Sequence, residues 1–378
     1  MARINIFGDF KANKVKHLNL SAELVYLLNT SDINMVNLEA PVISNGKPIK
    51  KSGPNLCQDQ DSPEWLELRG FNAISIANNH IMDFGKAGLD TTINSFKRAT
   101  VMGAGVWDDA YRINTFKTRD GLIIGVICCT HCEFGTLTER WDDNVREGCA
   151  WALSSEIVKN IYNSKRGGVD FLVIFQHGGL EYMEQPLPEC RERYRLWIDM
   201  GADAVIASHP HVPQGWETYK GKPILYSLGN FCFDYLNPKK PAPAHWYESI
   251  CCTLDVTEPH ECKVIIRPIF FDHLAGYISD YNNEEFDKHL QEMNATLCNE
   301  TKFYEYVNAF CEHLVDFYIN QFSRSGWITI GHCKGLLKGF IEGFLGRSFF
   351  SKCHAINNIR CESHRWAILR GLQQGKNK

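Results

Sequence analysis

Five short apolar runs in this sequence end directly in polar side chains that can bind metals. Each run has the length and composition of a buried β-strand. In an open α/β sheet, such strand ends lie along one edge, where ligand crevices form. The polar residues at these ends are Asp9, Glu39, Asn78-Asn79-His80, His177 and His209-Pro210-His211. The sequence therefore predicts an α/β fold whose strand ends bring these side chains together.

Each of these residues taken alone has a simpler explanation. Asp9 can begin a turn, Asn78-Asn79 are common turn residues, and a strand-end histidine usually pairs with a backbone carbonyl. Their recurrence favours a shared site, because carboxylates, an amide and imidazoles together suit two divalent transition metals. Two such ions roughly 3.5–4 Å apart can hold the nucleophile and the oxygens of an in-line displacement. The pattern therefore indicates metal-dependent hydrolysis.

Six motifs carry a resemblance to a known family. They are Gly8-Asp9, Asn37-Leu38-Glu39-Ala40-Pro41, Ala77 to Gly85, His177 to Tyr182, Ser208 to His211 and Tyr226 to Phe231. In order and spacing they resemble the CapA family of capsule and poly-γ-glutamate synthesis proteins, which belongs to the calcineurin-like metallophosphoesterases. The resemblance covers about residues 3–235. It implies a four-layer α/β/β/α sandwich, in which two packed sheets are flanked by helices and metals lie at the strand ends.

The resemblance also implies a set of metal ligands. Asp9 would bind one metal, Glu39 would bridge both, Asn79, His177 and His209 would hold the second, and His211 would complete the first. In the wider superfamily a histidine follows the first aspartate at two residues, but Lys11 stands there in this chain. A charged Lys11 could replace the missing metal charge and bind phosphate, whereas a neutral lysine is a rare ligand. The sequence therefore permits one or two divalent ions, of manganese, iron or zinc.

Catalytic and substrate-binding roles follow from the same motifs. His80 stands where the superfamily keeps a histidine that contacts the substrate phosphate and can protonate the leaving oxygen. Asp83 could hydrogen-bond His80, fix its tautomer and raise its pKa. The predicted substrate-binding residues are Lys11, Asn78, Glu181 beside Tyr182, and Asn230. For Asn230, presenting its amide to a ligand is one role and bracing a neighbouring loop is the favoured one.

Short strand-like runs alternate with helical patterns, which is typical of an α/β protein. We expect helices at Ser62 to Leu68, Gly88 to Arg98, Ser155 to Ser164 and Cys190 to Met200. Glu248 to Thr257 and Cys262 to Phe271 should form a hairpin that finishes the second sheet. The predicted domains are a metallophosphoesterase-like domain over residues 1–277 and a mostly helical, basic C-terminal extension over residues 278–378.

Composition narrows the class of protein. A length of 378 residues with 44% apolar content fits a globular chain. The fifteen cysteines are scattered and odd in number, and the N-terminus shows neither a signal peptide nor a membrane anchor, so we expect a reducing, cytoplasmic location. Cys129-Thr130-His131-Cys132 suggests zinc, but no second Cys/His pair follows at finger spacing, so no metal is assigned there.

The C-terminal end differs from the rest in charge. The net charge is −4, yet residues 331–378 carry nine Lys/Arg and two Asp/Glu. Such an end can be a solvated helix face, or it can meet an acidic partner or an anionic membrane on its cytoplasmic side. We expect no nucleic-acid partner. The apolar segment Gly335 to Leu345 is too short to span a bilayer, and we expect it to pack on the core rather than lie on a membrane.

The leading hypothesis is a metallophosphoesterase-like hydrolase that acts on a phosphorylated saccharide or an anionic polymer during capsule, surface-polysaccharide or poly-γ-glutamate synthesis. Capsule-synthesis proteins would be its partners. One alternative is a polymer-binding or assembly protein that keeps the scaffold without turnover, and Lys11 favours it. Another is a metal-dependent γ-glutamyl amide hydrolase, for which the sequence shows no specific motif.

Overall fold

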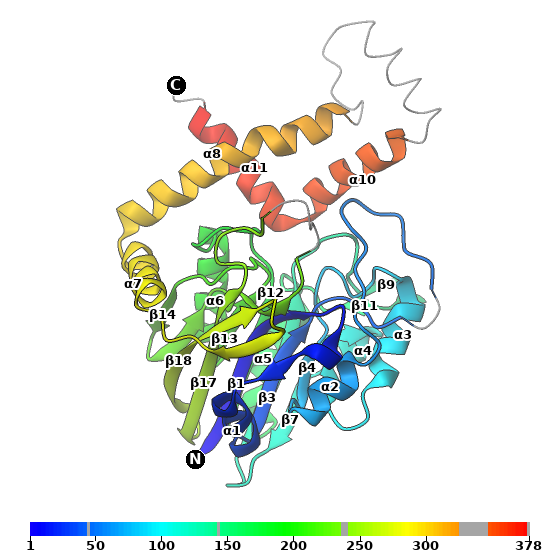
Figure 1. Cartoon of the computed structure of the whole chain (residues 1–378). Helices are drawn as coiled ribbons and strands as arrows, with labels where there is room; N and C mark the ends of the chain where they lie inside the picture. Colours follow the sequence, from blue (N-terminus) through cyan, green and yellow to red (C-terminus); the bar gives the residue numbers. More distant parts are fainter. Residues whose placement is uncertain (44–45, 142–143, 236–240, 325–346, 376–378) are drawn as a thin grey trace, which may run out of the picture.

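The computed structural model shows two β-sheets packed against each other, with helices covering their outer faces (Figure 1). It describes residues 1–43, 46–141, 144–235, 241–324 and 347–375. This arrangement confirms the predicted α/β/β/α sandwich. A helical region follows at the C-terminus, as predicted.

The first sheet has nine strands in the order β2-β19-β18-β17-β1-β3-β4-β5, and β16 also pairs with β1. Its strands are β1 (Ala2–Lys11), β2 (Asn19–Leu20), β3 (Ile33–Leu38), β4 (Ala73–Ser75), β5 (Thr100–Met102), β16 (Asn230–Phe233), β17 (Glu248–Glu258), β18 (Glu261–Asp272) and β19 (Tyr277–Asp280). Strands β1, β3, β4 and β5 run parallel. Their carboxyl ends therefore lie at one edge of this sheet.

The second sheet has six strands in the order β14-β15-β13-β12-β8-β7. Its strands are β7 (Asn114–Lys117), β8 (Ile123–Thr130), β12 (Phe171–His177), β13 (Ala204–Ser208), β14 (Trp216–Tyr219) and β15 (Lys222–Leu225). Strands β8, β12, β13 and β15 run parallel. Two small antiparallel pairs lie outside both sheets: β6 (Ala104–Gly105) with β11 (Gly148–Cys149), and β9 (Glu139–Trp141) with β10 (Asn144–Arg146).

Residues that alternate along a strand lie in separate apolar layers, and these layers hold the two sheets and their helices together. Ile4 and Ile6 of β1 lie in the layer between the two sheets. Phe7 lies in the layer that the first sheet shares with helices of the N-terminal half. Leu172 and Ile174 of β12 lie in the layer between the second sheet and its helices. Both sheets thus bury both faces, which requires nearly continuous apolar strands.

The helices begin and end where local chemistry favours it. The Ser154 side chain accepts a hydrogen bond from the Glu156 backbone at the start of α5, Pro188 opens α6, and Gly201 ends it with a φ of 122°. The helices before the C-terminal region are η1 (Val15–His17, 3-10), α1 (Ala22–Thr30), α2 (Ser62–Leu68), α3 (Gly85–Ser95), α4 (Trp107–Ala110), α5 (Ser155–Arg166) and α6 (Pro188–Met200). All four predicted helices are therefore present, with ends shifted by at most a few residues.

Residues 278–280 of the predicted extension still belong to β19 of the first sheet, and the described chain after them is mostly helical. Its helices are α7 (Glu284–Cys298), α8 (Glu300–Arg324), α10 (Arg347–Arg360) and α11 (Glu362–Gly375). Figure 1 shows α8, α10 and α11 lying across the edge of the sandwich. None of the described helices is long and apolar enough to cross a membrane. The predicted segment Gly335 to Leu345 lies outside the described residues, as do positions 331–346 and 376–378 of the basic stretch, so membrane contact stays a prediction.

The predicted hairpin is present, but its place in the fold differs from the prediction. Strands β17 and β18 pair in antiparallel fashion around a turn at Pro259 and His260. We expected them to finish the second sheet. Instead, β17 pairs with β1, so the hairpin extends the first sheet. The apolar alternation of a strand does not specify which partner edge it will join.

Gly8 allows β1 to approach the chain that follows β15. A Cβ atom at this position would stand 1.8 Å from the Gly229 carbonyl oxygen, and the Asp9 backbone N–H donates to that same oxygen at 3.0 Å. We expect Gly8→Ala to lower the free energy of unfolding by about 3 kcal/mol, because the strand junction must open. Urea unfolding of the metal-free protein measures this.

The control for this prediction is Gly46→Ala. A Cβ atom there would meet only the Phe84 side chain, at ordinary van der Waals distance. Its urea midpoint should match that of the parent chain. Equal midpoints for the two alanine variants would contradict the close approach at Gly8.

Candidate metal centre

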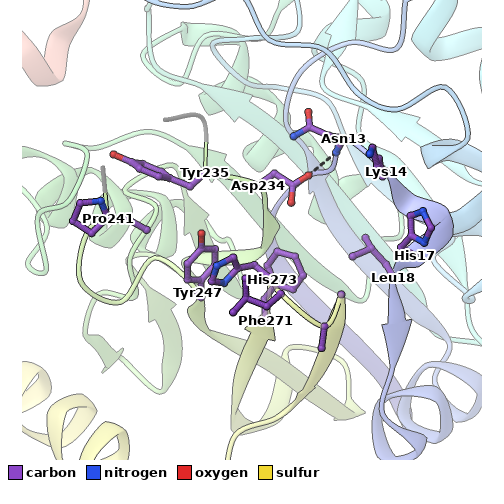
Figure 2. A pocket seen from close by; sticks show the side chains of 14 residues that line it. Asn13, Lys14, His17, Leu18, Asp234, Tyr235, Pro241, Tyr247, Phe271 and His273 are labelled. Atoms are coloured by element: carbon purple, nitrogen blue, oxygen red, sulfur yellow. Dashed lines mark hydrogen bonds between the residues drawn. The ribbon is translucent and has the colours of Figure 1, made fainter. Parts of the chain in front are cut away.

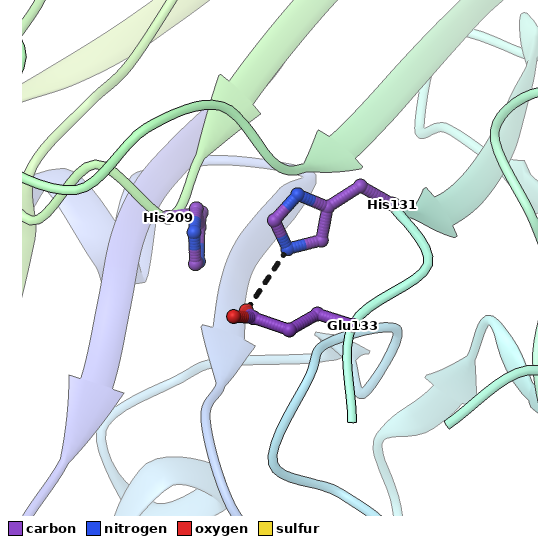
Figure 3. Close-up of side chains that lie close together, drawn as sticks. All are labelled: His131, Glu133 and His209. Carbon is purple, nitrogen blue, oxygen red and sulfur yellow. Dashed lines mark ion pairs between the residues drawn. The ribbon is translucent and has the colours of Figure 1, made fainter. Parts of the chain in front are cut away.

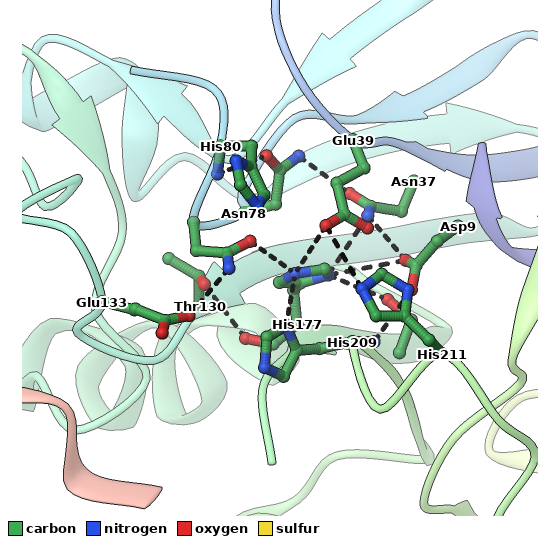
Figure 4. Close-up of polar contacts among 12 residues, drawn as sticks. Asp9, Asn37, Glu39, Asn78, His80, Thr130, Glu133, His177, His209 and His211 are labelled. Carbon is green, nitrogen blue, oxygen red and sulfur yellow. Dashed lines mark hydrogen bonds and ion pairs between the residues drawn. The ribbon is translucent and has the colours of Figure 1, made fainter. Parts of the chain in front are cut away.

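The strand ends bring all six predicted metal ligands to one buried cluster (Figure 4). Asp9 lies in β1 and His177 ends β12, whereas Glu39, Asn79, and the pair His209 and His211 follow β3, β4 and β13 respectively. The carboxyl ends of parallel strands from both sheets therefore meet at this edge, as the sequence pattern indicated.

His177 stands at the centre of the cluster. Its Nδ1 atom lies 3.5 Å from Asp9 Oδ1, and its Nε2 atom lies 4.0 Å from Glu39 Oε1. The same Nε2 atom lies 3.1 Å from Asn79 Oδ1 and 3.1 Å from His209 Nδ1. Ligand atoms of Asp9, Glu39 and His177 all lie within 4.8 Å of one another. This spacing suits donors that share one ion.

His211 also lies beside Asp9 and Glu39. Its Nδ1 atom lies 3.8 Å from Asp9 Oδ2, and its Nε2 atom lies 3.9 Å from Glu39 Oε1. Asn230 Oδ1 accepts from His211 Nδ1 at 2.9 Å, and the Asn230 amide donates to the carbonyls of His211 and Trp246. These contacts favour the bracing role for Asn230 over direct substrate binding.

The backbone at the histidine pair is strained. His209 has a φ of 105° and His211 a φ of 62°, a region that non-glycine residues rarely adopt. The His209 backbone N–H donates to Asp9 Oδ2 at 3.0 Å, which helps to hold this conformation. Strain of this kind persists where the surrounding structure over-determines it, and it clusters at functional sites.

The surroundings of the Glu39 carboxylate are the strongest indication of a bound cation. Its side chain is fully buried, and neither carboxylate oxygen has a hydrogen-bond partner among the described residues. Burial raises the pKa of Glu39 well above its ordinary value, and the nearby carboxylate of Asp9 raises it further. A buried carboxylate without donors is costly unless it is neutralised, and a divalent ion between Glu39, Asp9 and His177 would do so.

The surroundings of Asp9 and His209 lower the pKa of both side chains. Burial alone would raise the pKa of Asp9, but the adjacent His177 and His211 lower it, so the carboxylate is ionised. Burial, together with His131 and His177, holds the pKa of His209 well below its ordinary value. The cluster therefore offers an ionised carboxylate and a neutral imidazole, which are the protonation states that metal ligands require.

His80 and Asp83 are in contact, as predicted. His80 Nδ1 lies 2.7 Å from Asp83 Oδ2, and Asp83 also forms an ion pair with the buried Lys51. The prediction that His80 would have a raised pKa is wrong for this arrangement. Burial and the adjacent Lys51 ammonium lower the pKa of His80 to about 4, and Asp83 compensates only in part.

This low pKa predicts acid sensitivity in the metal-free protein. A histidine with a folded pKa of about 4 and an ordinary pKa of 6.5 contributes stability above pH 6.5 that is lost as the pH falls towards 4. We expect His80 to account for a loss of about 2 kcal/mol in unfolding free energy between pH 7 and pH 4.5. Urea unfolding at both pH values, in the parent and in His80→Gln, measures it. Equal pH dependence in the two chains would contradict it.

The other predicted substrate-binding residues differ from one another in burial and in their contacts. Asn78 is buried, and its amide donates to Asn37 Oδ1 and the Leu38 carbonyl, so it ties the loop after β4 to β3. Glu181 is exposed beside the cluster. Lys11 is buried, and its ammonium group donates to the Asn13 side chain. Burial lowers the pKa of Lys11, which nearby Asp234 opposes.

Four residues to which the sequence analysis assigned no role in this cluster join the site. Asn37 donates to Asp9 Oδ1 at 2.7 Å, and Glu133 accepts from the Asn79 amide at 2.7 Å. The other two are His131, which packs against His209 with ring centroids 4.4 Å apart, and Lys51. Residues 123–130 form another apolar run that ends in polar residues, so the original pattern could have identified His131 and Glu133.

Two hollows of the molecule differ in their relation to the cluster. One has a volume of about 980 Å³ and is lined by Asn13, Lys14, His17, Asp234, Tyr235, Tyr247 and His273 among others (Figure 2). None of the six predicted ligands lines it. A smaller hollow of about 140 Å³ is lined by Lys50, Lys51 and Arg360, and Lys51 Nζ lies 3.2 Å from His80 Nδ1. The smaller, basic hollow is therefore the one adjacent to the predicted chemistry.

Comparison with known proteins identifies the family. The family model described as "Bacterial capsule synthesis protein PGA_cap" matches residues 5–235, which is more than half of the chain. The chain belongs to this family. The match includes all six predicted metal ligands together with His80, and it ends before the C-terminal helices.

Curated proteins similar to this chain carry related names. The chain is 31% identical over 223 residues to "Capsule biosynthesis protein CapA" of Bacillus anthracis, covering 55% of this chain and 52% of that protein. It is 30% identical to "PGA biosynthesis protein CapA" of Bacillus subtilis, covering 55% of each. A "Probable polyglutamine synthesis accessory protein" of Mycobacterium tuberculosis is 27% identical, with coverage of 56% and 58%. The chain thus spans about half the length of these relatives.

Among solved structures, the sulfate thiohydrolase SoxB of Thermus thermophilus aligns with a TM-score of 0.38 and 12% sequence identity. The alignment covers 64% of this chain and 42% of that one.

Proposed function

We propose that this protein is a metal-dependent phosphoesterase that acts on a phosphorylated saccharide or an anionic polymer during capsule or poly-γ-glutamate synthesis. The buried Glu39 carboxylate carries the proposal, because its two oxygens have no partner among the described residues and three further donors surround it. Membership of the capsule synthesis family and the names of the relatives support the substrate class.

The residues of the cluster fit one or two divalent ions. The ions would be held by Asp9, Glu39, Asn79, His177, His209 and His211. A bound ion would act as a Lewis acid on the phosphoryl oxygens. The ion pair between Lys51 and Asp83 orients His80, whose Nδ1 atom contacts Asp83. His80 Nε2 is then the ring atom available to a substrate phosphate, whose negative charge favours protonation of the imidazole.

The basic residues near His80 would attract an anionic substrate. The Lys51 ammonium group lies over the Phe134 ring, 3.9 Å from its centroid. Lys51 also lines the smaller hollow together with Lys50 and Arg360. Arg360 also lines a neighbouring hollow of about 660 Å³ with Arg146 and Arg365. A phosphorylated chain entering along these cations would reach His80 and the metal cluster, and the field of the cations would raise its local concentration.

A second candidate is a polymer-binding assembly protein without turnover. Two observations favour it: Lys11 occupies the position of the superfamily histidine, and the mycobacterial relative is named as an accessory protein. Such a protein would still bind the polymer after the metal cluster is removed by the double change His209→Ala and His211→Ala. A phosphoesterase would lose turnover with the metal.

The deciding experiment measures metal content and phosphoesterase activity on the same preparations. Elemental analysis and assays with generic phosphomonoesters and phosphodiesters are run on the native chain, on His209→Ala and on His313→Ala. His313 is an exposed histidine of α8 and serves as the matched control. We expect metal and activity to fall together in His209→Ala and to be unchanged in His313→Ala.

Either of two results would overturn the proposal. The first is a native chain that stays metal-free and inactive after reconstitution with manganese, iron and zinc. The second is full activity in His209→Ala. Metal binding with polymer retention and no hydrolysis of any phosphoester tested would establish the assembly role instead.

A further inference from the structure

A second group of metal-binding side chains lies where the C-terminal helices meet the sandwich. The loop after β8 carries Glu133, and the junction of α10 and α11 carries Cys361 and His364. One ligand atom from each of these three residues lies within 4.8 Å of the other two. Glu133 and Cys361 are buried, and the His364 side chain is 15% exposed. The residues come from segments about 230 positions apart, so the fold alone brings them together.

His364 is oriented as metal-ligating histidines usually are. Its Nδ1 atom lies 3.1 Å from Asn358 Oδ1, and because an amide oxygen only accepts, Nδ1 carries the hydrogen. Its Nε2 atom therefore directs a lone pair towards Glu133 Oε1, 3.4 Å away, when the ring is neutral. Ligating histidines commonly donate their other N–H to a neighbouring oxygen in this way.

The arrangement of the three side chains favours a cation between them. Burial lowers the pKa of His364, which keeps the ring neutral at pH 7. His131 Nε2 lies 3.3 Å from Glu133 Oε2, so Oε1 is the carboxylate oxygen that faces His364. A lone pair and a carboxylate oxygen that face each other repel unless a cation lies between them. The Cys361 thiol stands beside both.

We propose that Glu133, Cys361 and His364 bind a zinc ion that fastens the C-terminal helices to the sandwich. A thiolate, an imidazole and a carboxylate are the ligand types that zinc accepts, and a soft thiolate disfavours magnesium, calcium and manganese. On binding, the Cys361 thiol loses its proton to solvent and sulfur bonds to the ion. Glu133 and His364 bind without losing a proton.

The site is separate from the cluster around Glu39 but linked to it. Glu133 Oε1 faces His364 and Asn357, whereas Glu133 Oε2 accepts from Asn79 and lies 3.3 Å from His131 Nε2. Figure 3 shows this second side of the carboxylate, where His131 and His209 lie close to Glu133. A zinc ion on Oε1 would therefore fix the carboxylate that orients Asn79, a predicted ligand of the first cluster.

The proposed zinc site also lies beside the motif Cys129-Thr130-His131-Cys132, to which the sequence analysis assigned no metal. Cys129-Thr130-His131-Cys132 has no second Cys/His pair at finger spacing. In the structure, Cys361 Sγ lies 3.8 Å from His131 Nδ1, and Glu362 accepts from the Cys132 backbone N–H at 2.9 Å. The Cys/His pair that meets this loop comes from the C-terminal helices instead.

The test compares zinc content in the full chain and in matched variants. Cys361→Ser combined with His364→Gln should lose one equivalent of zinc relative to the native chain. The control combines Cys298→Ser with His313→Gln, an exposed cysteine and an exposed histidine of α7 and α8, and should lose none. The partly buried group of Glu184, His245 and His289 is unchanged in every chain, so any zinc bound there cancels in the comparison.

Cobalt substitution identifies the thiolate directly and does not depend on the double variant folding. The native chain loaded with Co²⁺ should show a thiolate-to-cobalt charge-transfer band, and Cys361→Ser alone should lack it. His209→Ala should keep the band, because its ligand belongs to the first cluster. A band that survives in Cys361→Ser, or zinc content that is unchanged in the double variant, would overturn the proposal. Phosphoesterase activity enters neither readout, so failure of the proposed function would be seen separately.

Discussion

Glu39→Gln is expected to remove the metal from the strand-end cluster and to lower phosphoesterase turnover at least about 1,000-fold, equivalent to about 4 kcal/mol of transition-state stabilisation. The change keeps the shape of the side chain and removes the charge that balances a divalent ion. Elemental analysis and steady-state assays measure the two effects. The effect should be large because both Glu39 oxygens are buried without another partner in the described chain.

The stability of metal-free Glu39→Gln distinguishes loss of metal binding from misfolding. Because burial and the nearby Asp9 raise the pKa of Glu39, the folded metal-free protein holds a proton there that the unfolded chain releases as the pH rises. The metal-free native chain therefore loses stability above pH 4.5, and Glu39→Gln removes that loss. We expect the metal-free variant to be at least as stable as its parent at pH 8. A variant that keeps its metal, or one that is less stable without metal, would contradict this account.

His80→Ala is expected to leave the metal in place and to lower kcat by about 100-fold to 10,000-fold, the usual contribution of a proton-transferring side chain. The reason is geometric: the His80 ring contacts Asp83 and Lys51, and its contacts do not include the six predicted ligands. Metal analysis with kcat and KM measured separately tests the prediction. A fall in kcat with metal content unchanged is the expected signature.

Asp83→Asn is the companion variant to His80→Ala. It keeps a hydrogen-bonding side chain beside His80 and removes the negative charge that opposes the effect of Lys51 on the His80 pKa. We expect a smaller loss of kcat than in His80→Ala, together with a change in the pH profile. Full activity in His80→Ala would exclude His80 as a catalytic residue. Loss of metal in that variant would assign it to the metal cluster instead.

Much of the site could be predicted because its signal is local. Asp9, Glu39, His177 and His209 each follow a run of apolar residues, and the period of a strand depends only on neighbouring positions. Parallel strands place their carboxyl ends at one edge, so one repeated pattern was enough to expect the six side chains together. The same reasoning located four helices and the β17–β18 hairpin.

Other features depend on contacts between distant segments. The hairpin joined β1 instead of the second sheet, because alternation fixes which face of a strand is buried and leaves its partner open. The pKa of His80 fell because Lys51, on a separate loop, was buried beside it. The sequence pattern identified the contact with Asp83, three residues away, but not this second charge.

The C-terminal helices show the same division most clearly. Their helical character is readable from apolar residues at three- and four-residue steps, a period set within each helix. Their position against Glu133 cannot be read from the sequence, because Cys361 and His364 lie about 230 residues away from that carboxylate along the chain. Sequence by itself determined the elements and the strand-end ligands, because those follow from short-range periodicity. Only the tertiary structure decided which charges and thiols share a buried site, because burial depends on which apolar faces pack together.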